Sequence, residues 1–336
     1  MPGKPRIALT LGDYNGIGPE ILLKTLADPR QYQFYTPVVF GSEAVLRFYS
    51  GLLGLEDIPI RRIRDLEEAE AGEGLPVLDV LEDLEPRPEP GTVSAQAGEA
   101  AMRALEAALE ACREGRCAAL VTAPISKEAI HRAGYGYPGH TEYLAEKLGV
   151  SRYTMLMIWG ELRLGMVSVH VPLRQVVEEV TRERILDRLE IIDQSLRRDW
   201  GIQRPRIAVL GLNPHAGDGG VLGREEIEII EPALEEARQG GILAFGPFSA
   251  DGFFATAAYR RYDAVLAMYH DQAQIPFKTL AFYEGVNYTA GLPIVRTSPD
   301  HGTAFDIAGK GLARPDSLRA ALHLAWDLVR HRQVSV

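Results

Sequence analysis

The chain alternates between short apolar runs and longer amphipathic stretches. Runs such as RIALTLGD (6–13) and TPVVFGS (36–42) are rich in apolar and β-branched residues, and several others are apolar almost without a break. Unbroken apolar runs are typical of strands that are covered on both faces. We therefore predict strands at 6–13, 36–42, 117–124, 153–160, 165–173, 206–214, 263–271 and 292–300.

The stretches between these runs repeat their apolar residues at helical spacing. They predict helices at 98–115, 174–200, 225–241 and 317–333. Strands that alternate with helices indicate an α/β fold with a largely parallel central sheet. The acidic, proline-rich stretch at 81–94 predicts a surface connection rather than a regular element.

Size and charge narrow the classes of function. A chain of 336 residues is long enough for two domains or lobes. Its formal net charge of −10 argues against nucleic acid as a partner, and it means that an anionic ligand must be held by a few local cations. No signal peptide is evident and no segment has 18 consecutive apolar residues, so we expect a cytoplasmic protein that does not bind membranes.

The stretch GYGYPG (134–139) matches the G-x-G-x-x-G pattern of Rossmann dinucleotide-binding loops. That pattern works only where a strand enters the loop and a helix leaves it. The preceding stretch, SKEAIHRA (126–133), predicts a helical turn or two instead of a strand. The sequence therefore argues against a Rossmann fold.

Three histidines lie near the ends of predicted strands: His170, His215 and His270. In open α/β sheets ligands gather at the carboxyl ends of the strands. Three imidazoles with an open position are the pattern of a catalytic metal site, although a single buried histidine is more often structural. The pattern leaves both a metal site and three structural histidines open.

Two cations and an amide follow the third histidine: Lys278, Asn287 and Arg296. Arginine and lysine together can hold a phosphate or carboxylate, and solvated surface charges are the alternative. The apolar neighbours of Lys278 (IPFKTLAF) favour a buried amine. Two glycine-containing loops, at 11–21 and 298–318, either expose backbone N–H groups to an anion or form plain turns.

Seven motifs, in order along the chain, resemble the 4-hydroxythreonine-4-phosphate dehydrogenase family of vitamin B6 synthesis. They are LGDYNGIGPEI, VTAPISKEAI, GYPGHTEYLA, VSVHVPL, LNPHAGDGGVLGREE, MYHDQAQIPFK and GLPIVRTSPDHGTAFDIAGKG. The first and last also resemble isocitrate and isopropylmalate dehydrogenases. The resemblance implies two α/β lobes around a cleft: residues 1–135 with 295–336 on the nucleotide side, and residues 136–294 for metal, substrate and dimerisation.

The resemblance also assigns roles to individual residues. The implied metal ligands are His170, His215 and His270. The implied substrate contacts are His140, Thr141, Lys278, Asn287 and Arg296. The implied cofactor contacts are Gly12, Asp300, His301, Gly302 and Asp306. Lys278 and Asp251 are the implied catalytic residues.

The implied reaction is an NAD- or NADP-dependent, metal-assisted oxidation of 4-hydroxythreonine 4-phosphate to a β-keto acid that loses CO2. The metal is expected to be zinc, with cobalt or magnesium as alternatives, and the enzyme is expected to be a homodimer with its active site at the interface. Erythronate or threonate 4-phosphate are alternative substrates. Two other classes stay open: an acyltransferase of the phosphate acetyltransferase kind and a non-catalytic metal- or ligand-binding protein. The chain departs from the family pattern at Tyr14-Asn15, where Pro-Ala is expected.

Overall fold

The computed structural model describes residues 4–70 and 73–334. They form two compact units: unit 1 contains Met1–Gly149 and Leu292–Val329, and unit 2 contains Val150–Gly291 and Arg330–Val336. The sequence places the boundaries after residues 135 and 294 instead. The difference arises because α5 (His140–Lys147) packs within unit 1, where Tyr143 and Leu144 are buried and Lys147 pairs with Glu106 of α3.

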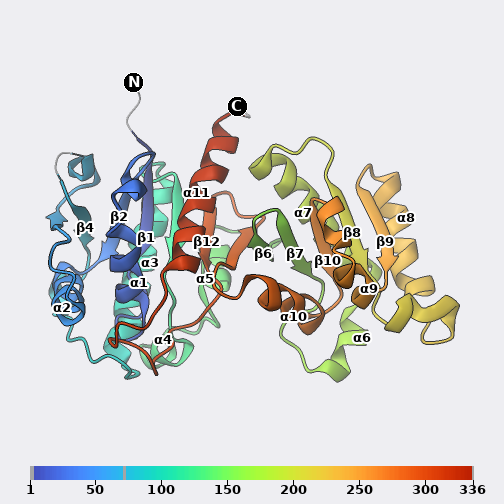
Figure 1. The fold of residues 1–336 in the computed structure, drawn as a ribbon, viewed down its shortest axis with the longest axis horizontal. Helices are drawn as coiled ribbons and strands as arrows, with labels where there is room; N and C mark the ends of the chain where they lie inside the picture. The colour runs from blue at the N-terminus through green and yellow to red at the C-terminus, as the bar shows by residue number, and fades with distance from the viewer. Residues whose placement is uncertain (1–3, 71–72, 335–336) are drawn as a thin grey trace. The chain divides into compact units, whose positions relative to one another are not determined.

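Unit 1 is built on a parallel sheet with the strand order β3-β4-β2-β1-β5-β12 (Figure 1). The apolar runs that predict strands form its centre, where β1, β2 and β5 are buried almost throughout. Its strands are β1 (Arg6–Thr10), β2 (Thr36–Gly41), β3 (Ile60–Ile63), β4 (Leu75–Asp79), β5 (Ala119–Thr122) and β12 (Val295–Pro299).

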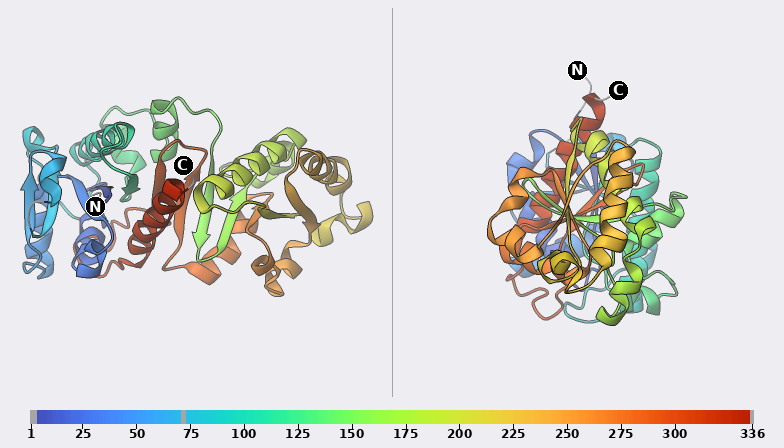
Figure 2. Two further views of the ribbon diagram at one scale, coloured as in Figure 1. Left: turned by 90° about the horizontal axis from the view of Figure 1, so that it is seen from above. Right: turned by 90° about the vertical axis from the view of Figure 1, so that its right-hand side faces the viewer.

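Helices cover both faces of this sheet. α3 lies against β1, β2 and β5 on one face, and α1 lies on the other face, as the view from above shows (Figure 2). This is the arrangement that right-handed crossovers between parallel strands produce. The helices of unit 1 are α1 (Gly18–Leu26), α2 (Glu43–Leu53), α3 (Ala95–Arg113), α4 (Lys127–Arg132), α5 and most of α11 (Asp316–Val334).

Unit 2 has a mixed sheet with the order β11-β6-β7-β10-β8-β9. The pairs β11–β6 and β6–β7 are antiparallel, whereas β7, β10, β8 and β9 run parallel to one another. The strands are β6 (Thr154–Trp159), β7 (Leu162–Met166), β8 (Arg206–Leu210), β9 (Leu243–Phe248), β10 (Ala264–Ala267) and β11 (Val286–Ala290). The fold is therefore α/β with a largely parallel sheet, as the sequence predicts.

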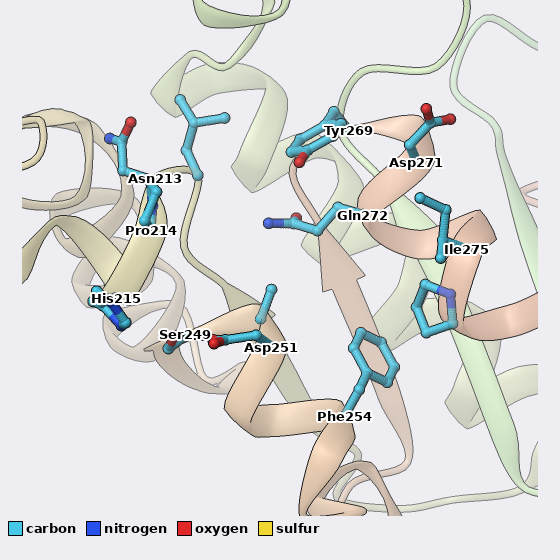
Figure 3. A pocket seen from close by; sticks show the side chains of 13 residues that line it. Asn213, Pro214, His215, Ser249, Asp251, Phe254, Tyr269, Asp271, Gln272 and Ile275 are labelled. Atoms are coloured by element: carbon cyan, nitrogen blue, oxygen red, sulfur yellow. Dashed lines mark hydrogen bonds between the residues drawn. The ribbon is translucent and has the colours of Figure 1, made fainter. Parts of the chain in front are cut away.

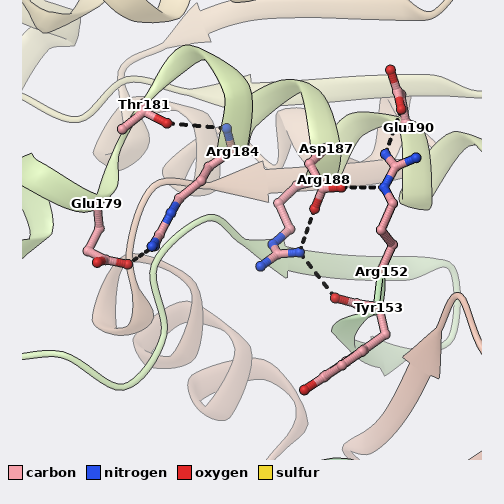
Figure 4. Close-up of polar contacts among 8 residues, drawn as sticks. All are labelled: Arg152, Tyr153, Glu179, Thr181, Arg184, Asp187, Arg188 and Glu190. Atoms are coloured by element: carbon pink, nitrogen blue, oxygen red, sulfur yellow. Dashed lines mark hydrogen bonds and ion pairs between the residues drawn. The ribbon is translucent and has the colours of Figure 1, made fainter. Parts of the chain in front are cut away.

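The helices of unit 2 are α6 (Val176–Glu179), α7 (Arg182–Trp200), α8 (Glu231–Gln239), α9 (Ala250–Ala255) and α10 (His270–Ala281). The single helix predicted at 174–200 is wrong, because the chain breaks between α6 and α7. Thr181 caps the second helix by accepting a hydrogen bond from the backbone N–H of Arg184 (3.3 Å), and Arg184 pairs with Glu179 across the break (Figure 4). A threonine at an N-cap satisfies one of the free N–H groups at the start of a helix.

Three predicted strands end four or more residues earlier than the sequence suggests. The run 165–173 forms β7 only as far as Met166, the run 206–214 forms β8 only as far as Leu210, and the run 263–271 forms β10 only as far as Ala267. Four further strands, β3, β4, β9 and β11, have no counterpart in the prediction. β3 (IRRI) and β9 (LAFGPF) carry charges, glycine or proline that hide the strand pattern.

The stretch GYGYPG lies between α4 and α5, so a helix and not a strand leads into it. The prediction that it is not a Rossmann fingerprint is confirmed. Among the described residues, no helix is long and apolar enough to cross a membrane. A cytoplasmic location stays a prediction.

Candidate active site

The segments that carry His170, His215 and His270 all begin at the same edge of the unit 2 sheet. β7, β8 and β10 are parallel neighbours, so their carboxyl ends lie at the same edge. His170 follows β7 by four residues, His215 lies in the loop after β8, and His270 is the first residue of α10 after β10. The sequence therefore locates the correct edge, although none of the three histidines lies within a strand.

His170 and His270 lie close together. Their ring centroids are 6.3 Å apart with an angle of 43° between the rings. The Nδ1 atom of His270 lies 2.7 Å from a carboxylate oxygen of Asp271. A carboxylate in this position orients an imidazole and leaves the other ring nitrogen, Nε2, free to bind a ligand.

His215 lies in an unusual loop. Residues 215–219 all have positive φ angles, including the non-glycine residues His215 (54°), Ala216 (51°) and Asp218 (45°). Such backbone is strained for residues that carry a Cβ and is found most often at functional sites. The buried Glu226 supports the loop by accepting hydrogen bonds from the backbone N–H groups of Leu212 and Asn213, each 2.7 Å long.

A cavity of about 570 Å³ opens beside this loop (Figure 3). His215, Ser249 and Asp251 lie toward one side of it, and Tyr269, Asp271 and Gln272 lie toward the other. The Ser249 hydroxyl donates to Asp251 (2.6 Å), and this bond, with the backbone of Gly252 and the nearby His215, holds the pKa of Asp251 below its usual range. Asp251 is therefore an anion at neutral pH and faces the cavity as an acceptor.

The three histidines are suitable metal ligands by type, but their side chains are not gathered around one point. Within residues 4–70 and 73–334, no group of three His, Cys, Asp or Glu side chains is gathered closely enough to hold a metal ion. His170 and His215 are exposed and His270 is half-buried, so their rings have room to turn. A shared ion requires such a movement.

In unit 1 a buried arginine forms the second part of the candidate site. Arg296 of β12 is only 2% exposed and donates from a terminal nitrogen to the Thr122 hydroxyl of β5 (2.7 Å). Burial lowers the pKa of Arg296 to about 10, so it stays charged at neutral pH. A buried guanidinium is retained where it binds a carboxylate or phosphate bidentately.

His140 and Thr141 begin α5 close to this arginine. Burial, with the charge of Arg296, holds the pKa of His140 well below its usual range, so its imidazole is neutral. Its Nε2 atom is buried and has no hydrogen-bond partner among the described residues. Gly139, at the N-cap, supplies no side-chain cap, so the first N–H groups of α5 also face this region. The structure thus brings Arg296 close to His140 and Thr141, although more than 150 residues separate the arginine from this pair in the sequence.

The other two predicted substrate contacts belong to unit 2. Asn287 of β11 donates to the sulfur of Met155 (3.5 Å), and its amide oxygen is buried without a partner in the described part of the chain. Lys278 of α10 is exposed, so the prediction of a buried amine is wrong. α10 buries Phe277 and Ala281, and the apolar residues around Lys278 in sequence therefore point to another face of the helix.

The predicted cofactor residues lie on two loops of unit 1. Asp306 and Gly302 are exposed, and Asp300 and His301 are half-buried, so this loop is accessible to a ligand. The backbone N–H of Asp300 donates to the hydroxyl of Ser317 (3.2 Å), near the start of α11. Gly12 is different: it is buried, has φ +70°, and a Cβ there would lie 2.5 Å from the carbonyl oxygen of Pro124. Glycine is needed there for packing, and a contact of Gly12 with the cofactor stays a prediction.

One residue of the unit 1 site is missing from the sequence prediction. Thr122 ends β5 and holds Arg296 in place. The signal is a polar residue at the carboxyl end of an otherwise apolar strand (AALVTAP, 118–124).

The chain consists of two α/β units, with a buried arginine and strand-end imidazoles at its candidate sites. Its similarity to known proteins identifies it as a dehydrogenase. It belongs to the family described as pyridoxal phosphate biosynthetic protein PdxA, whose model matches residues 33–325.

Two curated relatives and one solved structure illustrate the similarity. A 4-hydroxythreonine-4-phosphate dehydrogenase of Bacteroides thetaiotaomicron is 47% identical, over 98% of this chain and 90% of the relative. A D-threonate 4-phosphate dehydrogenase of Pectobacterium atrosepticum is 42% identical, over 96% of this chain and 98% of the relative. The crystal structure of 4-hydroxythreonine-4-phosphate dehydrogenase from Klebsiella pneumoniae matches with a TM-score of 0.85 and 42% identity, covering 97% of this chain and 98% of that one.

Proposed function

We propose that the chain oxidises 4-hydroxythreonine 4-phosphate with NAD or NADP, and that the product is a β-keto acid that loses CO2. The observation that carries the proposal is the anion site of unit 1, where buried Arg296 lies near the neutral His140 and the uncapped N-terminus of α5. On a protein of net charge −10, a buried cation of this kind is a specific site for an anionic group. The names of the relatives support the choice of substrate.

Each site residue contributes a defined interaction. Arg296 binds an anionic group of the substrate, and the neutral His140 and the Thr141 hydroxyl hydrogen-bond its polar groups. Asn287 offers to a donor on the substrate its amide oxygen, which has no partner among the described residues. Lys278 either binds an anionic group as an ammonium or, as a neutral amine, takes the proton that leaves the hydroxyl; Asp251 is the other candidate for that proton.

We assign the cofactors to the two sets of residues that remain. His170, His215 and His270 would hold a divalent ion, most simply zinc, with cobalt or magnesium as alternatives. Asp271 orients His270 for this role. The nicotinamide nucleotide binds along Asp300, His301, Gly302 and Asp306. When bound, the metal would supply a Lewis acid for the substrate hydroxyl, and the nicotinamide would supply a hydride acceptor.

The roles of the two units follow from this assignment. Unit 1 carries the nucleotide loop and the anion site, and unit 2 carries the metal ligands. We propose that unit 2 also forms a homodimer interface that completes the active site.

A second candidate is D-threonate 4-phosphate, because the 42% identical relative carries that name. D-threonate 4-phosphate has the phosphate and the hydroxyl of 4-hydroxythreonine 4-phosphate but lacks its amino group. Erythronate 4-phosphate has the same features. Membership of a dehydrogenase family removes the acyltransferase and the non-catalytic alternatives.

A panel of phosphorylated hydroxy acids tests the proposal. The three substrates above are offered with NAD and with NADP, before and after treatment with a chelator and after addition of zinc. We expect reduction of the cofactor with 4-hydroxythreonine 4-phosphate, loss of turnover after chelation and recovery with metal. The matched variant His215→Ala should lose at least tenfold in metal affinity or activity. The proposal fails if no member of the panel reduces either cofactor, and the metal assignment fails if His215→Ala keeps its full metal content and rate.

A further inference from the structure

Asn15 makes four hydrogen bonds to one distant segment. It lies in the first loop (residues 11–18), is 1% exposed, and contacts the strap (residues 85–94) that the sequence shows as a proline-rich connection. Its Nδ2 atom donates to the hydroxyls of Thr92 (3.2 Å) and Ser94 (3.3 Å). Its Oδ1 atom accepts from the N–H of Glu89 (2.7 Å), and its carbonyl oxygen accepts from the N–H of Gly91 (2.8 Å).

Tyr14 fixes the segment at its two ends. Its hydroxyl donates to Oε1 of Gln96 (2.8 Å), just beyond the strap, and Nε2 of Gln96 donates to the carbonyl oxygen of Leu84 (2.9 Å), just before it. Tyr14 is itself buried and is held by Tyr49, whose hydroxyl donates to its carbonyl oxygen (2.7 Å). Tyr14 and Asn15 together therefore anchor the strap.

The strap has little means to order itself. It contains three prolines, at 86, 88 and 90, which donate no backbone hydrogen bonds and cannot form a helix or a central strand. Its remaining N–H groups must find partners elsewhere. Asn15 supplies partners for two of them, those of Glu89 and Gly91.

The strap and the first loop both pack against the nucleotide loop (residues 300–311). A Cβ at Gly91 would lie 3.0 Å from the carbonyl oxygen of Phe305, and a Cβ at Gly309 would lie 2.9 Å from the Cβ of Pro90. The N–H of Ile17 donates to the carbonyl oxygen of Thr303 (3.0 Å). The hydrogen bond joins two backbones, and the two glycines leave no room for even a Cβ between the strap and the nucleotide loop, so a shift of the strap toward this loop must displace it.

We propose that Asn15 is a positioning residue for the nicotinamide nucleotide, which it affects through the strap and the nucleotide loop. The inference rests on the proposed function, in which residues 300–306 bind NAD. Asn15 is buried beneath the strap, so its effect on the nucleotide would pass through the strap. Its hydrogen bonds hold the strap, and the strap holds the nucleotide loop in the conformation that binds. Without the hydrogen bonds of Asn15, the nucleotide loop would become ordered only when the nucleotide binds. The entropy lost in ordering the loop would then lower the affinity for the nucleotide.

The test is the variant Asn15→Ala in the full-length protein. Hydrogen exchange should accelerate at the amides of Glu89 and Gly91 and across residues 300–311. The dissociation constant of NADH, measured by its fluorescence, should rise about tenfold, as should KM for NAD. We expect kcat, KM for the phosphorylated substrate and the metal content to change less than twofold. General destabilisation would affect all of these quantities and not the nucleotide affinity alone.

Two controls keep the outcomes distinct. Arg132→Ala also removes a hydrogen bond to the strap, from an exposed arginine of α4 to the carbonyl oxygen of Val93 (2.9 Å), and should leave NADH affinity unchanged. Asp306→Ala alters the nucleotide loop directly and should weaken NADH binding. If only Asp306→Ala weakens binding, the role of Asn15 is refuted and the proposed function stands. If neither does, the nucleotide assignment itself is wrong.

A milder variant covers the case in which Asn15→Ala does not fold. Thr92→Val removes one hydroxyl that accepts from Asn15 and leaves the other three bonds in place. It should raise the dissociation constant of NADH in the same direction by a smaller factor. Unchanged affinity in a folded Thr92→Val protein whose strap exchanges faster would overturn the inference.

Discussion

Asp13 shows how a single buried carboxyl can make stability depend on pH. It lies in the first loop and is fully buried; its Oδ1 atom accepts a hydrogen bond from the N–H of Asn15 (2.9 Å), and its Oδ2 atom has no partner among the described residues. Burial raises the pKa of Asp13 to about 6, although the backbone N–H groups of Asn15 and Gly16 oppose the rise. A carboxyl whose pKa is higher in the folded state favours folding when it is protonated.

The sign of the effect follows from that shift. The contribution of Asp13 to stability is fully present below about pH 4 and is lost as the pH rises through about 6. Asp13→Asn removes the charge and keeps an acceptor for the Asn15 N–H. We expect the variant to match the parent at pH 4 and to exceed its free energy of unfolding by about 3 kcal/mol at pH 8. Urea unfolding at both pH values measures this, and an equal difference at pH 4 and pH 8 would contradict the account.

At the scale of the elements, one buried carboxylate joins three of them in unit 2. Asp199, near the end of α7, is fully buried and accepts hydrogen bonds from Arg198 (2.7 and 3.0 Å), from Arg332 in the last turn of α11 (2.7 Å) and from the Tyr288 hydroxyl of β11. Burial alone would raise the pKa of Asp199, but the two arginines outweigh it and hold the pKa below its usual range. The stability that this pairing provides is therefore present at neutral pH and is lost as the pH falls below about 4.

Removal of this charge should be costly. Asp199→Asn removes a fully buried carboxylate that accepts hydrogen bonds from two arginines and Tyr288, and we expect it to lower the free energy of unfolding by about 3 kcal/mol. Glu190→Gln, on the same helix, removes an exposed ion pair with Arg152 (2.6 Å; Figure 4) and should change it by less than about 0.5 kcal/mol. Chemical unfolding of both variants is the measurement, and equal losses would show that burial of Asp199 adds nothing.

At the scale of the whole molecule, unit 2 exposes large apolar side chains on several elements. Leu173 is 73% exposed, Val221 79%, Ile275 65% and Phe282 70%. Exposed apolar side chains of this size mark an interaction surface where they adjoin one another, and we assign these to a second copy of the chain. This assignment rests on the homodimer proposed above.

Light scattering at micromolar concentration should therefore find a dimer. Phe282→Glu should shift the protein toward monomer and reduce turnover, because a charge buried in an apolar interface is unfavourable. Leu312→Glu, at a side chain of unit 1 that is 64% exposed, is the control and should leave the oligomeric state unchanged. A monomeric parent protein would rule out this assignment.

The sequence by itself determined the class of fold and the residue types of the site. Apolar runs such as 6–13 and 36–42 fold into the strands they predict, because covered strands need continuous apolar sequence. Histidines near the ends of neighbouring strands pointed to one edge of the sheet. The boundaries of unit 1 and the break before α7 escaped prediction, since they depend on how α5 packs and on which residue caps a helix.

Only the tertiary structure decided which of these residues meet and how deeply they are buried. It brings the rings of His170 and His270 to 6.3 Å, buries Arg296 beside Thr122, and exposes Lys278 despite its apolar neighbours. It also shows that Tyr14 and Asn15 anchor a strap more than 70 residues away. Periodicity records only which face of an element is apolar. Contacts between distant residues depend on the packing of whole elements against one another, which no local pattern encodes.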